Sequence, residues 1–141
     1  MEKLSVEQRV ENAIRWIDGL KKTRVKQGQG ELGDSKSGYC CLGYGCMRNK
    51  VPYDPREEYS NEFQKSVGLK TYAGEFSDVY TLGGIDDWGD PIEADSLAEL
   101  NDDHKLSFKE ISGIIISQAD LLFIGEVAKG IKRHYKNLEK K

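Results

Sequence analysis

Apolar residues near the N-terminal end of the chain recur with the spacing of one helix face. They are Val6, Val10, Ala13, Ile14, Ile17 and Leu20. Ser5 precedes this stripe and Gln8 lies three positions after Ser5. This is the pattern of a capping box, in which two residues satisfy each other's backbone amides. The sequence therefore predicts a first helix over about residues 6–21.

Helical patterns also fill the last third of the chain. Asp95 or Ser96 can cap a short helix in "DSLAELNDD", and Ser107 with Glu110 forms a second capping box that opens "FKEISGIII". Residues 118–138 then carry a repeat made of Leu121, Ile124, Val127, Ala128, Ile131, Tyr135 and Leu138. The repeat predicts one long amphipathic helix with its basic residues late, as the helix dipole favours. Because this stripe is broad for a short chain, we also predict a homodimer or higher oligomer.

Strand patterns between these helices are short. Residues 23–32 and 34–42 predict a hairpin around a turn of Gly, Asp and Ser residues. The segment "CCLGYGCMRN" fits either a buried strand or a short helix, since Gly43 and Gly45 weaken both. Residues 52–95 are rich in turn formers and predict irregular structure with one strand at "DVYTL".

No internal repeat or low-complexity linker divides the 141 residues, a length that suits one hydrophobic core. We therefore expect a single α+β domain over 1–141. It should have an N-terminal helix, a small antiparallel sheet or hairpins, and C-terminal helices.

Charge is segregated along the chain, although the net charge is only −3. Residues 75–103 contain ten acids and no Lys or Arg. The flanks are mildly basic, with 13 basic and 10 acidic residues in 1–74, and 8 and 4 in 104–141. A solvated acidic face explains the acidic tract better than a cation site at Asp86, Asp87, Asp90 and Glu93, because these acids do not follow the calcium-loop spacing. Mimicry of nucleic-acid charge is a third interpretation.

Composition excludes a membrane-spanning segment. Apolar residues make up 38% of the chain and charged residues 32%, and no run of about 18 apolar residues occurs. The first residues, "MEKLSVEQRVENAIRW", mix charges with apolar side chains from the second position, unlike a secretory signal. We therefore expect a cytoplasmic protein. In that reducing compartment an odd number of cysteines, two of them adjacent, argues against a disulfide framework.

All three cysteines lie in "GYCCLGYGC", at positions 40, 41 and 46. Structural zinc sites favour two ligands separated by two to four residues, and this segment has another spacing. A catalytic thiolate needs a cationic or histidine partner, whereas His104 follows an acidic run and His134 lies far along the chain. We therefore predict buried thiols that pack in the core, with no metal, no cofactor and no catalytic residue.

Two nucleotide-related patterns have the wrong context. Residues 28–33 match G-x-G-x-x-G but follow the basic run "KKTRVKQ" rather than a buried strand, so we interpret them as turn glycines. "SLAELNDDHKLSFKEISGII" has the outline of a helix-turn-helix, yet its second helix offers only Lys109 as a cation. We therefore expect no sequence-specific DNA binding.

Four blocks in one order carry a family resemblance: "AIRWIDGLKK", "KQGQGEL", "YCCLGYGC" and "SLAELNDDHKLSFKEISGII". Together they resemble a family of small bacteriophage and prophage proteins with Cys-Cys-Leu-Gly and Leu-Asn-Asp blocks. The second Gly of "GYGC" departs from the aliphatic residue typical of these relatives. The resemblance implies a viral protein in the host cytoplasm and supplies no particular chemistry.

In that setting we predict a non-catalytic binding module that acts against host defence by sequestering a nucleotide-type signal. Cations and backbone amides near the glycine turn would hold phosphates, and aromatic rings would stack on bases, Trp16 being a further candidate. The predicted ligand-binding residues are Arg24, Lys26, Gln27, Gly28, Gly30, Tyr39 and Tyr44.

Two alternatives remain open. One is an inhibitor that binds a host defence protein directly. The other is a small cysteine- or metal-dependent hydrolase, in which Cys40, Cys41 or the Asp86–Asp90 cluster would meet a base in space.

Overall fold

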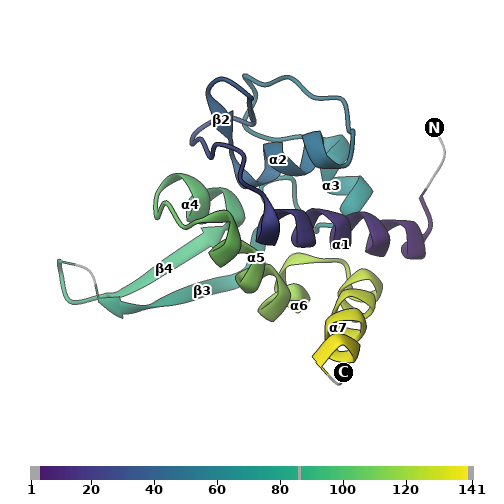
Figure 1. Ribbon diagram of the computed structural model, residues 1–141. Helices are drawn as coiled ribbons and strands as arrows, with labels where there is room; N and C mark the ends of the chain where they lie inside the picture. Colours follow the sequence, from purple (N-terminus) through teal and green to yellow (C-terminus); the bar gives the residue numbers. More distant parts are fainter. Residues whose placement is uncertain (1–3, 86, 140–141) are drawn as a thin grey trace.

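The computed structural model describes the backbone of residues 4–85 and 87–139 and has an α+β fold, as the sequence predicts (Figure 1). Its elements in chain order are α1 (Val6–Lys22), β1 (Gly33–Asp34), β2 (Gly38–Tyr39), α2 (Cys41–Arg48), α3 (Asn61–Val67), β3 (Glu75–Ile85), β4 (Pro91–Ser96), α4 (Leu97–Asp102), α5 (Phe108–Ser117), α6 (Ala119–Leu122) and α7 (Gly125–Glu139).

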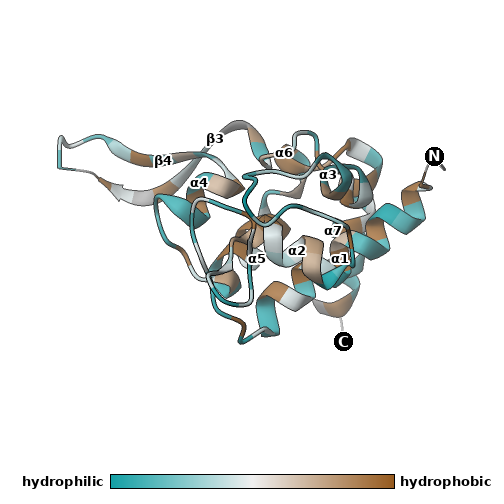
Figure 2. Cartoon of the chain, turned by 90° about the horizontal axis from the view of Figure 1, so that it is seen from above, coloured by the Kyte–Doolittle hydropathy of each residue, from teal (hydrophilic) through white to brown (hydrophobic). Residues whose placement is uncertain are grey.

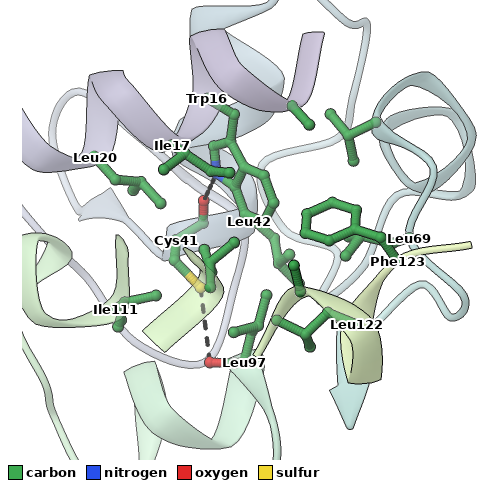
Figure 3. Close-up of a cluster of buried hydrophobic side chains, with 14 of the residues drawn as sticks. Trp16, Ile17, Leu20, Cys41, Leu42, Leu69, Leu97, Ile111, Leu122 and Phe123 are labelled. Atoms are coloured by element: carbon green, nitrogen blue, oxygen red, sulfur yellow. Dashed lines mark hydrogen bonds between the residues drawn. The ribbon is translucent and has the colours of Figure 1, made fainter. Parts of the chain in front are cut away.

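Helix α1 is the centre of the packing and confirms the first predicted helix. Its capping box is formed, since Ser5 and Gln8 satisfy each other's backbone amides. Helices α2, α3, α5 and α7 all contact α1, and Figure 1 shows α2 and α3 on one side of it and α5 and α7 on the other. Trp16, Ile17 and Leu20 are at most 1% exposed and belong to the core (Figure 3). Of the predicted apolar stripe, Ala13, Ile17 and Leu20 are buried, Val10 and Ile14 are half-buried, and Val6 is exposed.

Helix α2 resolves the ambiguous cysteine segment, and tertiary packing explains its glycines. A Cβ on Gly43 would lie 1.8 Å from the Leu32 carbonyl oxygen, and a Cβ on Gly45 would lie 2.3 Å from the Phe63 ring. Both distances are far below van der Waals contact, so only glycine lets the helix approach so closely. The Cys40 sulfur accepts a hydrogen bond from the Gly43 amide and caps the helix.

The hairpin predicted for residues 23–42 is much shorter than expected. Only Gly33–Asp34 and Gly38–Tyr39 pair as antiparallel strands. The Asp34 carboxylate accepts the amides of the turn between them. Residues 23–32 do not form the first strand: Gln27 makes one isolated parallel bridge to Tyr39, and the Leu32 amide donates to the Glu57 carbonyl instead.

The predicted irregular region 52–95 is corrected in its second half, where β3 and β4 form an antiparallel hairpin, hereafter the arm (Glu75–Ser96). The expected strand at 78–82 is part of β3. Phe76 and Ala94 are buried at the base of the arm, and Tyr80 and Leu82 further along β3 are half-buried against the core. Figures 1 and 2 show the distal part of the arm extending away from the helices. Register shifts between the strands and glycines within β3 hide this long hairpin from a reading of local patterns.

The C-terminal helices confirm two caps and correct one element. Ser96 caps α4 and the Ser107–Glu110 box opens α5. The single helix predicted over 118–138 is wrong, because Phe123 is extended and fully buried between α6 and α7. There the chain pairs with residues 68–70 through bonds from the Lys70 amide to the Leu122 carbonyl and from the Ile124 amide to the Gly68 carbonyl.

The apolar stripe of α7 is largely covered within the chain. Val127, Ala128, Ile131 and Tyr135 are at most 7% exposed, and α7 packs on α1. Ile124 and Leu138 of the predicted repeat are 46% and 49% exposed. The exposed part of the stripe is therefore smaller than the sequence suggests, and the oligomer stays a prediction. Among the helices of the described residues, none combines the length and apolarity needed to cross a bilayer.

Candidate functional site

A buried polar junction joins three of the sequence blocks that carry the family resemblance. The fully buried Asn101 side chain accepts hydrogen bonds from the Cys41 amide (3.1 Å) and the Gln27 amide nitrogen Nε2 (2.8 Å). Its own Nδ2 donates to the Gly28 carbonyl at 2.8 Å. Gln27 also donates to the Leu106 carbonyl. The junction therefore holds the loop after α1, the start of α2 and the end of α4 together.

This junction changes the role of several predicted ligand-binding residues. The Gln27 side chain is engaged in it, and the Gly28 amide donates to the Tyr39 carbonyl. Lys26 pairs with Tyr39 through its carbonyl, and its exposed ammonium donates to the Lys36 carbonyl. The structure thus brings residues 26–28 beside Tyr39, but their hydrogen-bonding groups are engaged in bonds within the protein rather than directed at a ligand.

The remaining predicted residues lie apart from that turn or on the open surface. Arg24 and Gly30 are exposed. Trp16, considered as a stacking group, is fully buried and donates its indole N–H to the Cys41 carbonyl at 2.9 Å, which excludes it from a ligand surface (Figure 3). Tyr44 lies on α2 and borders a different feature.

That feature is an open hollow of about 410 Å³ between the C-terminal half of α1 and helix α2, hereafter the basic hollow. Its lining residues are Arg15, Asp18, Gly19, Lys22, Thr23, Tyr44 and Arg48. Residues three or four positions apart share a helix face, which is why 15, 18, 19 and 22 from α1 and 44 and 48 from α2 meet here.

Gly19 brings the Tyr44 phenol into the hollow. A Cβ at position 19 would lie 2.5 Å from the Tyr44 hydroxyl oxygen and 3.0 Å from the ring carbon Cε2. Tyr44 is only 4% exposed and its ring packs against Phe108 with centroids 5.5 Å apart. Within the described part of the chain its hydroxyl has no hydrogen-bond partner, so this group is available to a ligand.

Positive charge dominates the basic hollow. Arg15, Lys22 and Arg48 form no salt bridge within residues 4–85 and 87–139, and Arg15 donates one hydrogen bond to the Asn12 side chain. The single acid, Asp18, accepts a hydrogen bond from the Tyr135 hydroxyl at 2.8 Å. Part of the cationic charge balances the negative C-terminal ends of α1 and α2. The remainder makes the hollow suited to an anion.

The cysteines lie in the core, as the sequence predicts. All three are free thiols and buried, and Figure 3 shows Cys41 among the apolar side chains of the core. Burial raises the pKa of the Cys40 thiol to about 11 and that of Cys46 to about 12, and it raises the pKa of Cys41 well above its usual value. The neutral thiol is therefore the stable form at physiological pH, which argues against a nucleophilic thiolate.

Metal binding has little support in the geometry. The described residues contain no group of three or more His, Cys, Asp or Glu side chains placed to hold an ion. His104 lies 3.6 Å from the Glu99 carboxylate, at the surface between α4 and α5. Asp86 of the acidic tract lies outside the described residues.

Comparisons with protein-family models, with curated proteins and with solved structures found no match. The candidate site therefore rests on geometry. Sequence reasoning placed Tyr44 in a site and considered Lys22 as part of the basic run, but it missed Arg15 and Arg48. One signal in the sequence was available. Arg15, Gly19 and Lys22 share one face of the first predicted helix, and a glycine inside a helix, away from any turn, indicates a close approach by another element.

Proposed function

We propose that the protein is a non-catalytic binding module that holds an anionic, nucleotide-type molecule in the basic hollow. The observation that carries the proposal is that Arg15, Lys22 and Arg48, which have no salt bridge within the described residues, line one hollow together with Tyr44. Guanidinium groups bind phosphate oxygens through paired, charge-assisted hydrogen bonds. Tyr44 adds a neutral hydrogen bond that helps to orient the ligand.

The size and openness of the hollow suit a small molecule bound at the surface. A volume of about 410 Å³ lies in the range of small-ligand sites. The phage-type setting, which rests on the resemblance alone, makes a nucleotide signal of a host defence system the first ligand to test.

The test measures binding of a nucleotide panel by calorimetry, with mass spectrometry of the molecules released by heat. Lys22→Ala combined with Arg48→Ala should weaken binding by roughly 100-fold, because each lost charge-assisted hydrogen bond is worth about 1.5 kcal/mol or more. The matched control, Arg24→Ala with Lys26→Ala, removes two exposed cations next to the hollow in sequence but absent from its lining. It should retain affinity.

Two results would contradict this proposal. If no nucleotide binds, or if both double variants lose affinity equally, the basic hollow is not the site. Release of a chemically altered nucleotide would favour the hydrolase alternative.

Inhibition by direct binding to a host defence protein is the second candidate function. The observation that favours it is the arm, which extends from the helices with Ile85 68% exposed and Trp88 89% exposed. Large apolar groups in such positions commonly mark protein contacts.

A further inference from the structure

The arm carries a distinct chemistry at its tip. Residues 75–96 contain seven acids and neither Lys nor Arg. Trp88 is 89% exposed, and the neighbouring Asp87 and Asp90 are exposed. The tip thus presents a large aromatic ring flanked by carboxylates.

This combination matches the ligand proposed for the basic hollow. A nucleotide joins an aromatic base to anionic phosphates, and the arm joins an indole to carboxylates. Arginine and lysine attract both parts, the ring through cation–π contact and the carboxylates through ion pairs. The hollow contains three such cations and a phenol.

We infer that the arm tip of one copy docks in the basic hollow of a second copy, where it competes with the anionic ligand. The competition rests on the proposed function, whereas the docking rests on the arm and the hollow themselves. The product is a homotypic assembly that the ligand dissociates.

Charge complementarity favours a second copy as the occupant. Since the whole chain has a net charge of −3 and residues 75–103 carry −10, the other residues carry +7. Two arms cannot pair along their open strand edges without placing their acids side by side, which is unfavourable. An acidic arm on a basic hollow is the homotypic contact that brings opposite charges together.

Geometry excludes the hollow of the same chain. Both views show the arm pointing away from the helices (Figures 1 and 2). At about 3.3 Å per residue, the 11 residues of β3 span roughly 35 Å. The part of the arm beyond the half-buried Tyr80 and Leu82 projects from the helices and can reach a neighbouring molecule. Two copies that exchange arms around a two-fold axis satisfy both contacts.

The experiment compares mass by light scattering with Trp fluorescence. In low salt the parent protein should form a species of about twice the 15.9 kDa chain mass. Its association constant should fall at least tenfold on moving to about 0.5 M salt, since screening weakens exposed charge pairs. Trp16 is fully buried, so a blue shift of the emission on association reports Trp88.

Variants locate the contact. Trp88→Ala should abolish association, whereas Tyr72→Ala, which removes another exposed aromatic ring (48% exposed) outside the arm, should not. Arg48→Glu alone and Asp87→Lys with Asp90→Lys should each weaken association at least tenfold. A mixture of these two proteins should restore a hetero-dimer, because the reversed charges again complement each other.

ATP serves as the probe for competition and separates the two hypotheses. Dissociation of the dimer by ATP, with ATP binding retained in Trp88→Ala, supports both. Association that requires Trp88 and Arg48 without any nucleotide binding supports the docking and refutes the proposed function. A protein that binds nucleotide but stays monomeric in low salt at all concentrations overturns the docking and leaves a foreign basic protein as the partner of the arm.

Discussion

Replacing Asn101 by leucine tests whether the buried junction stabilises the whole fold. Leucine has a side chain of the same branched shape but neither donates nor accepts a hydrogen bond. The Cys41 amide and the Gly28 carbonyl, bonded to Asn101 at 3.1 and 2.8 Å, would lose these partners in a buried setting. Gln27 would keep its bond to the Leu106 carbonyl.

The expected loss follows from the two orphaned backbone groups. Each costs about 1–3 kcal/mol, and the additional apolar surface of leucine returns about 1 kcal/mol, which leaves a net loss of roughly 1–5 kcal/mol. For a domain of this size the melting temperature should fall by about 3–20 °C. Urea unfolding followed by circular dichroism measures both the free energy of unfolding and the slope that confirms a two-state transition.

A matched control and a second variant make the result specific. Asn137→Leu changes an exposed asparagine on α7 and should cost less than about 0.5 kcal/mol. Asn101→Asp keeps the acceptor but loses the donor to Gly28 and places a carboxylate beside the Asp102 side chain. Its penalty, relative to the parent protein, should shrink as the pH falls and the new carboxyl becomes protonated. A cost below about 1 kcal/mol for Asn101→Leu would refute the role assigned to the junction.

Three further predictions concern stability. Cys41→Ser should cost about 1–3 kcal/mol, because it places a hydroxyl in a fully buried site with a long contact to the Leu97 carbonyl. Cys40→Ser should cost less, because serine is a good helix cap for the Gly43 amide. Urea unfolding compares the two variants, and an equal loss of stability would contradict the capping role. Ser107→Ala should destabilise the protein by about 1 kcal/mol through the lost cap of α5, with a melting temperature unchanged by the substitution as the contrary result. Burial raises the pKa values of all three thiols, so above about pH 9 the unfolded chain releases their protons while the folded chain retains them. The free energy of unfolding should therefore fall as the pH rises from about 9 to 11, and it should fall less steeply in Cys41→Ala.

Local patterns located the helices because caps and apolar spacing act over a few residues. The boxes at Ser5 and Ser107 mark the starts of α1 and α5, and the stripe of α1 is the core face. The burial of the three cysteines also followed from their residue type and from the absence of a suitable partner nearby. In these cases the information lies within one turn or one face of an element.

The candidate site was only partly accessible to such reasoning. Tyr44 was selected as an aromatic group near the glycine turn, and it does border the basic hollow. The basic run at 21–26 drew attention to Arg24 and Lys26, whereas the hollow takes only Lys22 from that run and adds Arg15 and Arg48. These residues lie close together only because α1 packs against α2. Gly19 of α1 leaves room for the Tyr44 side chain, which comes from α2.

Sequence patterns alone predict the fold class, the capped helices, the buried cysteines and the separation of an acidic tract from a basic remainder. Long-range packing decided that Gln27 bridges Tyr39 in parallel instead of lying in an antiparallel strand, that the chain breaks at Phe123, and that most of the acidic tract extends as an arm. The physical reason is the range of the interactions. Caps and amphipathic spacing connect residues within a few positions, whereas the Asn101 junction, the pairing of residues 68–70 with 122–124, and the basic hollow join groups tens of residues apart, whose partners no local pattern identifies.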